Sequence, residues 1–318
     1  MFACCITLGA GVSSACDLCA VYNSIEAQGV SADSFFIGAT HQYTSFGSPA
    51  LLPGREILGK QHLESFTTQI YSGYRFTDRF GVQVNLPLIE RKFRRISDNV
   101  IETGSESGLG DISLLFKYTP AQIYSSESSF FYEFFGGFKL PSGDSDRLAE
   151  EQDEAEERSI FRHGSVDGNF VAGDDLALGS GSLDYILGAS FFGQYRFISY
   201  SGSLQGSIRT EGDYDYQYGN DLQFNLAAGY FYAPSEDSTV DLRLRFSGEI
   251  KSKDQINGSD IEGSDDTVLY LGPQLSFSNS GLWYGSLGID FPIKKDDSSE
   301  ELTPDYRVQF TLSRRFRS

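Results

Sequence analysis

A repeat of two residues in the distribution of apolar side chains is the feature that most limits how this chain can fold. In the stretch VDLRLRFSGEIK, Val240 to Lys251, every even position is apolar or glycine, whereas five of the six odd positions are charged. Successive side chains of a β-strand point to opposite faces, so this pattern predicts a strand with one apolar and one charged face. One such strand fits a two-layer sandwich as well as a membrane barrel.

The alternation recurs along the chain from residue 34 onward. We identify twelve such segments, at 34–46, 64–77, 80–95, 108–119, 129–141, 181–196, 198–211, 220–233, 239–252, 267–278, 282–295 and 304–317. They exceed the usual globular strand of about 5 to 6 residues and reach the roughly 9 to 11 residues that cross a bilayer at a tilt. Their number is even, as in single-chain bacterial barrels.

Connection lengths separate the sandwich from the barrel. The connections after even-numbered segments are short, as at 78–79 and 279–281, and those after odd-numbered segments are longer, the largest being 142–180. All long connections would then leave one end, which is typical of membrane barrels with short periplasmic turns and long outer loops. We therefore predict an all-β protein, an antiparallel up-and-down transmembrane β-barrel of about 12 strands over 34–318, in the bacterial outer membrane.

Aromatic and acidic residues are distributed as such a barrel requires. Aromatic residues on the apolar face gather beside the short turns and predict a girdle at one membrane interface: Tyr74, Phe76, Phe80, Tyr118, Phe130, Tyr195, Phe197, Tyr230, Tyr232, Phe277, Trp283 and Phe316. The acids behind the net charge of -19 concentrate in the long connections. This charge excludes nucleic acid as an expected partner. It indicates a solvated outer surface, or divalent-cation bridging to anionic surface lipids.

The first 33 residues are expected to lie before the barrel. Residues 1–15 end in the small residues Ser13, Ser14 and Ala15 and predict a signal peptide. Its basic start is missing, so we expect a truncated or misassigned beginning; a buried N-terminal strand is the alternative. Residues 16–33 would form a periplasmic segment. Its Cys16 and Cys19 suit a redox pair, half of a metal site, a lipid anchor at Cys16 or a local disulfide, and we expect the disulfide between them.

The inward face of the predicted barrel is rich in charge. The pore-lining residues that we predict are Arg75, Lys117, Glu133, Lys139, Arg196, Arg209, Asp241, Arg243, Arg245, Glu249, Lys251, Asp290, Arg307 and Arg315, and further inward positions are Asp111, Asp184, Asp221 and Lys294. Rings of Arg and Lys favour anions in pores. The alternative is that opposite charges pair across strands and fill the lumen.

Catalytic chemistry is not indicated. The three histidines, His41, His62 and His163, have neither triad-like nor metal-ligand spacing, and no phosphate-binding glycine loop is present. We expect no catalytic residue, metal or cofactor, and His41 is interpreted as a polar residue of the lumen or rim. A hydrolase built on His41 is the weakest of the functional hypotheses.

Three stretches resemble a known family. GLGDISLLFKY (108–118), GGFKLPSGD (136–144) and GSGSLDYILG (179–188) are similar to outer-membrane barrels assigned to the meta-cleavage pathway of phenol degradation. The resemblance implies uptake of small aromatic or other hydrophobic compounds, and its motifs mark strand ends and turns. The last segment also resembles the signal that the barrel-assembly machinery reads in outer-membrane proteins.

These observations predict an outer-membrane channel or transporter for passive passage of small solutes, such as anionic, aromatic or hydrophobic compounds. The expected partners are outer-membrane lipid and lipopolysaccharide, the barrel-assembly machinery and the solute. The alternative is an envelope scaffold that docks a periplasmic protein or an electron carrier through the Cys16–Cys19 segment or the acidic loops.

Overall fold

The computed structural model describes residues 34–47, 61–97, 100–157, 169–235, 237–294 and 302–317. The predicted signal peptide, the 16–33 segment with Cys16 and Cys19, and His163 lie outside these ranges.

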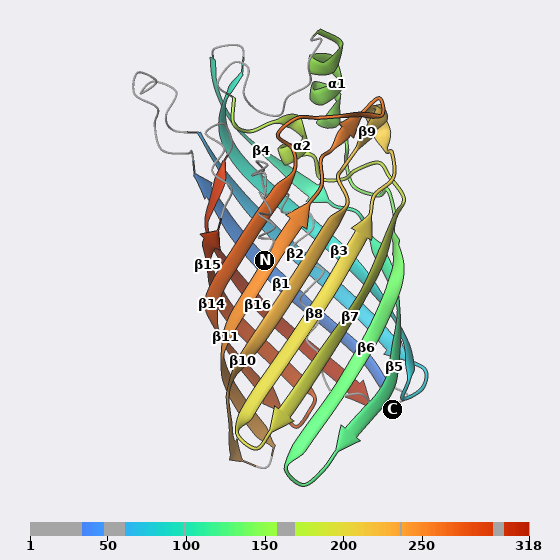
Figure 1. Cartoon of the computed structure of the whole chain (residues 1–318), viewed down its shortest axis with the longest axis vertical. Helices are drawn as coiled ribbons and strands as arrows, with labels where there is room; N and C mark the ends of the chain where they lie inside the picture. The colour runs from blue at the N-terminus through green and yellow to red at the C-terminus, as the bar shows by residue number, and fades with distance from the viewer. Residues whose placement is uncertain are drawn as a thin grey trace, which may run out of the picture.

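A closed ring of antiparallel strands forms the body of the molecule (Figure 1). The strands are β1 (Ser34–Gly47), β2 (His62–Arg75), β3 (Phe80–Ser97), β4 (Val100–Leu109), β5 (Ser113–Tyr124), β6 (Ser128–Lys139), β7 (Asp184–Tyr195), β8 (Ile198–Ile208), β10 (Asp221–Ser235), β11 (Ser238–Lys251), β14 (Asp266–Asn279), β15 (Trp283–Lys294) and β16 (Thr303–Arg317). Consecutive strands of the ring pair with each other, except that β4 and β5 both pair with β3, and β1 also pairs with β16. Because β4 and β5 pair with successive halves of β3, they count as one interrupted strand, and the barrel has 12 strands.

The predicted barrel is therefore confirmed, with one difference in the fourth segment. Instead of one strand over 108–119, β4 and β5 together span Val100 to Tyr124 with a break at 110–112. On β3 two residues separate Asn85, the last residue paired with β5, from Leu88, the first residue paired with β4. Three residues separate their partners Ser113 and Leu109. This extra residue is a bulge beside Pro87, which has no N–H for the ladder.

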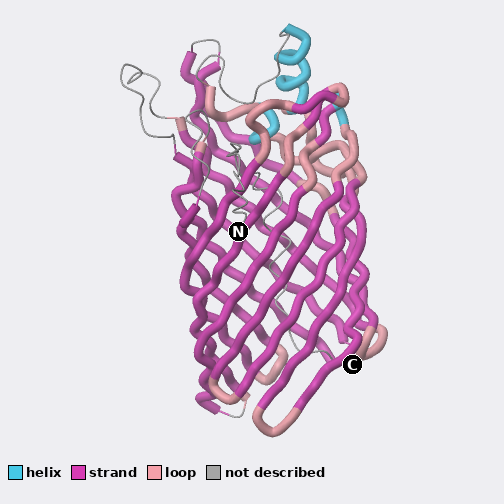
Figure 2. The backbone as a smooth tube through the Cα atoms, in the orientation of Figure 1, coloured by secondary structure: helices cyan, strands magenta, loops and turns pink. Residues whose placement is uncertain are grey.

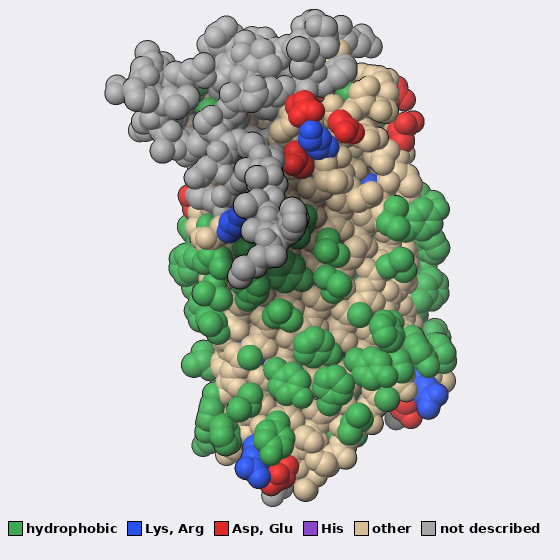
Figure 3. All heavy atoms as spheres, viewed as in Figure 1, with side chains coloured by type: hydrophobic (Ala, Val, Ile, Leu, Met, Phe, Trp, Pro, Cys, Tyr) green, Lys and Arg blue, Asp and Glu red, His purple; other side chains and the backbone are tan. Residues whose placement is uncertain are grey.

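The barrel wall has an apolar outer face and a polar inner face, as the alternation predicts. Eleven of the twelve predicted girdle aromatics are exposed on the outer face, and Phe130 is half-buried there. Figure 3 shows apolar side chains over the height of the wall, with charged side chains toward its two ends. An apolar band of this kind faces lipid, so the chain lies in the bacterial outer membrane.

The two ends of the barrel differ. Short turns join the strands at one end, and the long connections form a folded cap at the other end (Figure 2). The cap contains α1 (Leu148–Glu157), α2 (Gly173–Leu176), the 3-10 turn η2 (Asp213–Asp215) and a small sheet of β9 (Tyr216–Gln217), β12 (Gln255–Ile256) and β13 (Ser259–Asp260). Among the described residues, no helix has the length and apolar character needed to cross a membrane.

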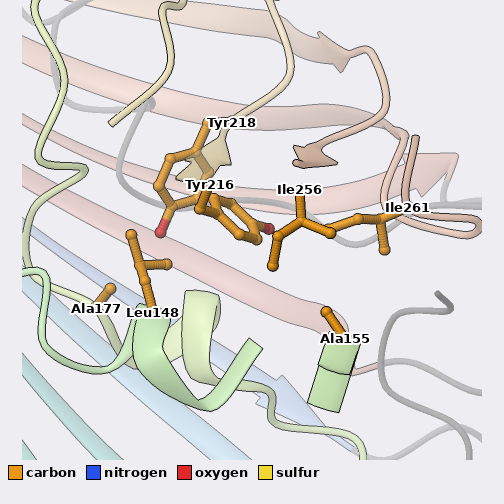
Figure 4. Close-up of a cluster of buried hydrophobic side chains, with 7 residues drawn as sticks. All are labelled: Leu148, Ala155, Ala177, Tyr216, Tyr218, Ile256 and Ile261. Atoms are coloured by element: carbon orange, nitrogen blue, oxygen red, sulfur yellow. The ribbon is translucent and has the colours of Figure 1, made fainter. Parts of the chain in front are cut away.

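Two apolar clusters stabilise the cap, the first within the cap and the second between the cap and the barrel. In the first, Leu148 and Ala155 of α1 lie under Tyr216 and Ile256 of the small sheet (Figure 4). In the second, Val171 and Leu176 beside or within α2 pack against inward-facing residues at the loop ends of three strands, namely Phe46, Leu63 and Phe93. Part of the 142–180 connection is thus lodged in the barrel mouth.

Arginines near the mouth fix the two helices of the cap. Arg95 of β3 donates to Glu150 of α1 at 2.7 Å, and Arg91 donates to the carbonyl oxygen of Asp175 in α2. Burial alone would raise the pKa of Glu150, but hydrogen bonds from Arg95 and Arg147 outweigh it and hold this pKa below its usual value. The helices are therefore held by charge as well as by apolar packing.

Candidate functional site: the charged interior of the barrel

The structure places thirteen of the fourteen predicted pore-lining residues on the inner face. Arg75, Lys117, Glu133, Lys139, Arg209, Asp241, Arg243, Arg245, Glu249, Lys251, Asp290 and Arg315 are buried there, and Arg307 is nearly so. The prediction is wrong for Arg196, which lies in the turn between β7 and β8 with 54% of its side chain exposed and pairs with Glu127. The alternation of a strand does not continue through a turn. Lys294 is likewise exposed at the end of β15.

A compact ionic group lies near the short turns. Arg75 and Lys117 both contact the carboxylate of Glu133, at 3.1 and 3.0 Å, and Thr119 also donates to Glu133, at 3.3 Å. Two cations here share one carboxylate, so neither is an isolated charge at the turn-side opening.

A second group lies on β11, β15 and β16. Asp290 accepts hydrogen bonds from Arg245 at 2.6 Å and from Arg307 at 3.2 Å. Arg307 also lies over the Tyr270 ring, at 4.2 Å from its centroid. Nearby, Arg243 contacts Asp241 at 3.4 Å and donates to Ser276 at 2.8 Å. We call Arg243, Arg245, Asp290 and Arg307 the mid-barrel cluster.

A small cavity opens beside the mid-barrel cluster. Its volume is about 20 Å³, enough for roughly one water molecule. The side chains and backbone around it come from four strands, β10, β11, β14 and β16: Gln223, Phe224, Asn225, Arg245, Ser247, Gly248, Glu249, Tyr270, Arg307 and Gln309. This cavity is a narrow polar space on the inner side of the wall.

The three family-like motifs converge on a third group at the loop end. Asp111, from the first motif, accepts hydrogen bonds from Lys139 of the second at 2.9 Å and from the backbone N–H of Ser180 of the third at 2.9 Å. The backbone N–H groups of Ser142 and Gly143 donate to its other oxygen, at 3.1 and 2.9 Å. Motifs that mark only strand ends in the sequence thus form one buried group.

The network at the loop end continues across the next strands. Asp184 contacts Lys139 at 2.6 Å and Arg209 at 2.9 Å, and Arg209 contacts Asp221 at 2.7 Å. Ser182 donates to Asp184 at 2.8 Å. We call Asp111, Lys139, Asp184, Arg209 and Asp221 the loop-end cluster.

Backbone packing explains the glycines of these motifs. A Cβ added to Gly179 would lie 2.5 Å from the carbonyl carbon of Gly143, so only glycine allows the two segments to meet. Burial alone would raise the pKa of Asp111, which lies between β4 and β5 at the rim. The Lys139 charge and the backbone donors outweigh burial and hold this pKa below its usual value.

Uncharged polar side chains lie on the inner face beside these ionic groups. On β1, β2, β3 and β16 they include Thr40, Gln42, Gln69, Gln83, Asn85 and Thr311, all buried. Thr40 and Thr311 share a hydrogen bond of 3.0 Å where the first and last strands meet. The inner face thus combines paired charges with uncharged polar groups.

Ion pairs dominate the charged interior. Eight of the predicted basic residues on the inner face have a carboxylate oxygen within ion-pair distance: Arg75, Lys117, Lys139, Arg209, Arg243, Arg245, Lys251 and Arg307. Of the two sequence-based alternatives, the structure favours pairing across strands. Sequence reasoning missed Asp254, a loop residue that contacts Lys251 at 2.8 Å.

His41 lies neither in the lumen nor at the rim. It is exposed on the outer face of β1, and its Nδ1 lies 2.8 Å from Thr68 Oγ1. The sequence pattern of β1 does not say which of its two faces is the inner one. The neighbouring residues Thr40 and Gln42 are buried on the inner face, so His41 points outward. Among the described residues, no group of three or more His, Cys, Asp or Glu side chains is arranged to hold a metal ion.

A closed 12-strand barrel with a lipid-facing apolar band and a polar interior defines an outer-membrane β-barrel of the porin-like class. The family resemblance is confirmed by a family model described as "Putative MetA-pathway of phenol degradation", which matches residues 164–312, a range that includes the third motif.

A solved structure of an outer-membrane channel has the same fold. The COG4313 outer membrane channel from Pseudomonas putida F1 superimposes with a TM-score of 0.60 at 14% identity, covering 92% of this chain and 98% of that one. The translocator domain of the autotransporter NalP from Neisseria meningitidis reaches 0.40 at 10% identity, covering 92% of this chain and 90% of that one. At the latter score the overlap does not establish a shared fold. No curated protein matches the chain in sequence.

Proposed function

We propose that the chain is an outer-membrane channel for the passive passage of small polar solutes. The observation that carries this proposal is the cavity beside the mid-barrel cluster, which is lined by polar and charged side chains such as Gln223, Arg245 and Glu249. A barrel with an apolar core would offer no such route.

The same geometry limits what the channel passes. The cavity is about as wide as a water molecule, and eight lumenal cations are paired with carboxylates. We therefore infer a low conductance with weak ion selectivity, and small solutes rather than bulky ones. Tyr270 under Arg307 provides a flat cationic surface that suits small anionic or aromatic solutes.

Single-channel recording of the refolded protein in a planar bilayer tests the proposal. Small, steady currents with a reversal potential near zero under a salt gradient are expected. Silence from a protein shown to be folded would contradict it and would favour the alternative, a scaffold barrel that docks a partner through its acidic loops or its Cys16–Cys19 segment.

The proposal assigns no enzymatic role. His41 has Thr68 as its neighbour on the outer face, but the residues that a hydrolase needs to stabilise a developing oxyanion are not among its contacts in the described structure. The variant His41→Ala is expected to conduct like the wild type, and any lipid hydrolysis that this variant abolished would contradict the assignment.

A further inference from the structure

A groove in the outer wall is the starting point. It lies on the lipid-facing side of β6, β7, β8 and β10, has a volume of about 470 Å³, and is almost entirely apolar. Outward side chains that line it are Phe130, Tyr132, Ala189, Phe191, Leu204 and Leu226. Its volume is within the range of about 300 to 1,000 Å³ that is typical of ligand sites.

Small residues in the wall explain why a groove exists here. Ala189 provides a short side chain between the larger Leu204 and Phe191. A Cβ added to Gly202 would lie 2.5 Å from the Phe191 ring and 2.9 Å from Leu226, so Phe191 packs directly over this glycine. Two residues away on the same face of β7, Leu187 is 60% exposed and stands out from the wall. The groove is therefore a depression built into the wall.

An exposed ion pair lies at the turn-side end of this groove. Phe130 at the edge of the groove is three residues from Glu127, which corresponds to about 10 Å along a strand. Glu127 contacts Arg196 at 3.1 Å, and both side chains are more than half exposed. Arg196 also lies over the Tyr195 ring, within the aromatic girdle. Arg196, which does not line the lumen, thus lies where lipid headgroups meet the barrel.

We propose that this groove and the Glu127–Arg196 pair form a binding site for one zwitterionic phospholipid of the periplasmic leaflet. One acyl chain lies in the groove, the phosphate meets Arg196, and the primary ammonium of a phosphatidylethanolamine-type headgroup meets Glu127. The groove is continuous with the lipid-facing band, so its occupant comes from the membrane.

Charge complementarity selects the headgroup. Arg binds phosphate through paired N–H donors, and a carboxylate accepts hydrogen bonds from an ammonium. A trimethylated choline headgroup has no N–H to donate to Glu127, and the uncharged glycerol of an anionic phosphatidylglycerol headgroup has no positive charge to pair with it. Both kinds of lipid should bind less tightly than phosphatidylethanolamine. This inference does not rest on the channel function.

Native mass spectrometry of the folded full chain in detergent tests the site. The probes are phosphatidylethanolamine, phosphatidylcholine and phosphatidylglycerol with identical acyl chains, added in turn. One tightly retained phosphatidylethanolamine per barrel is expected, with at least about fivefold weaker retention of the other two lipids.

Variants separate the two halves of the site. Ala189→Trp fills the groove and should weaken retention roughly tenfold, whereas the matched control Leu187→Trp, on the same face outside the groove, should bind like the wild type. Arg196→Gln should reduce retention of all three lipids, whereas Glu127→Gln should remove the preference for phosphatidylethanolamine. Each variant is first shown to be folded by its heat-modifiable migration on a gel, and Ala189→Met replaces the Trp variant if that one does not fold.

Three results would overturn the proposal. These are equal retention by the Ala189 and Leu187 variants, equal retention of all three lipids by the wild type, or a dimer of the chain that covers the groove in place of lipid.

Discussion

The loop-end cluster and the mid-barrel cluster are both buried groups of ion pairs, but they are surrounded differently. Asp111 receives backbone N–H donors from two loop segments in addition to Lys139, so the loop-end cluster ties loops to strands. Asp290 is shared by two arginines beside a cavity, and the groups around it are side chains of the wall. The first arrangement suits an anchor for the cap, and the second suits a passage.

The loop-end cluster gives the largest expected effect. Asp111→Ala leaves Lys139 with one partner fewer and several buried N–H groups without an acceptor, which should cost about 3 to 5 kcal/mol of unfolding free energy. Trp283, the only tryptophan, reports unfolding in urea by its fluorescence. Asp153→Ala on the exposed side of α1 is the control. If both variants unfold alike, the cluster is not an anchor.

Acid should release the cap only at low pH. Because the folded-state pKa of Asp111 and that of Glu150 are lowered, their contribution to stability is complete above the ordinary carboxyl range and is lost as the pH falls through the lowered folded-state pKa. Hydrogen exchange at Ser142, Gly143 and Ser180, scaled by intrinsic rates, should show unchanged protection from neutral pH to about pH 5. Loss of protection within that interval would refute the anchoring role.

The mid-barrel cluster should change selectivity more than stability. Asp290→Asn removes the negative charge that Arg245 and Arg307 share, so the reversal potential should shift toward anions, at a cost of about 1 to 3 kcal/mol in stability. The combined variant Arg243→Glu and Arg245→Glu should shift it toward cations. Unchanged selectivity in both variants would remove these residues from the conduction path.

The uncharged side chains of the lumen should give the smallest effect. Within the described structure neither amide atom of Gln205 has a hydrogen-bond partner, so Gln205→Leu should change the unfolding free energy by less than about 1 kcal/mol and leave selectivity unchanged. Asn85→Leu is the comparison, because its amide donates to Ser113 at 2.8 Å and its loss should cost more. A larger loss with the Gln205 variant would indicate that this side chain holds ordered water.

The strands of the barrel could be predicted because each carries its own pattern of alternation. The pattern assigns a face to Arg245 and to Asp290 separately, yet it does not say that they meet, because their pairing depends on the register of strands that are not neighbours. The convergence of Asp111, Lys139 and Ser180 was missed because Asp111 and Ser180 lie in a strand break and in a connection, where alternation gives no position. Arg196 was misplaced because a two-residue turn has no alternation to follow.

The cap could not be predicted at all from periodicity. Its clusters join Leu148 to Tyr216 and Ile256, residues from three connections that have no repeating pattern of their own. Such contacts depend on where the barrel places the ends of its strands, so they can be predicted only when the structure of the barrel is known.

Because β1 pairs with β16, the barrel can close only after the last strand of the chain has been added. The hydrogen bond between Thr40 and Thr311 joins residues 271 positions apart in the chain. Until the last strand is in place, β1 and the growing end of the sheet both expose unpaired backbone groups, which invite association with other chains and cannot be tolerated in lipid. The β1–β16 pairing therefore has to form last, while the unpaired strand edges are shielded from other chains and from lipid. A mutation that prevents β16 from pairing would leave an open, aggregation-prone sheet even if every other strand formed.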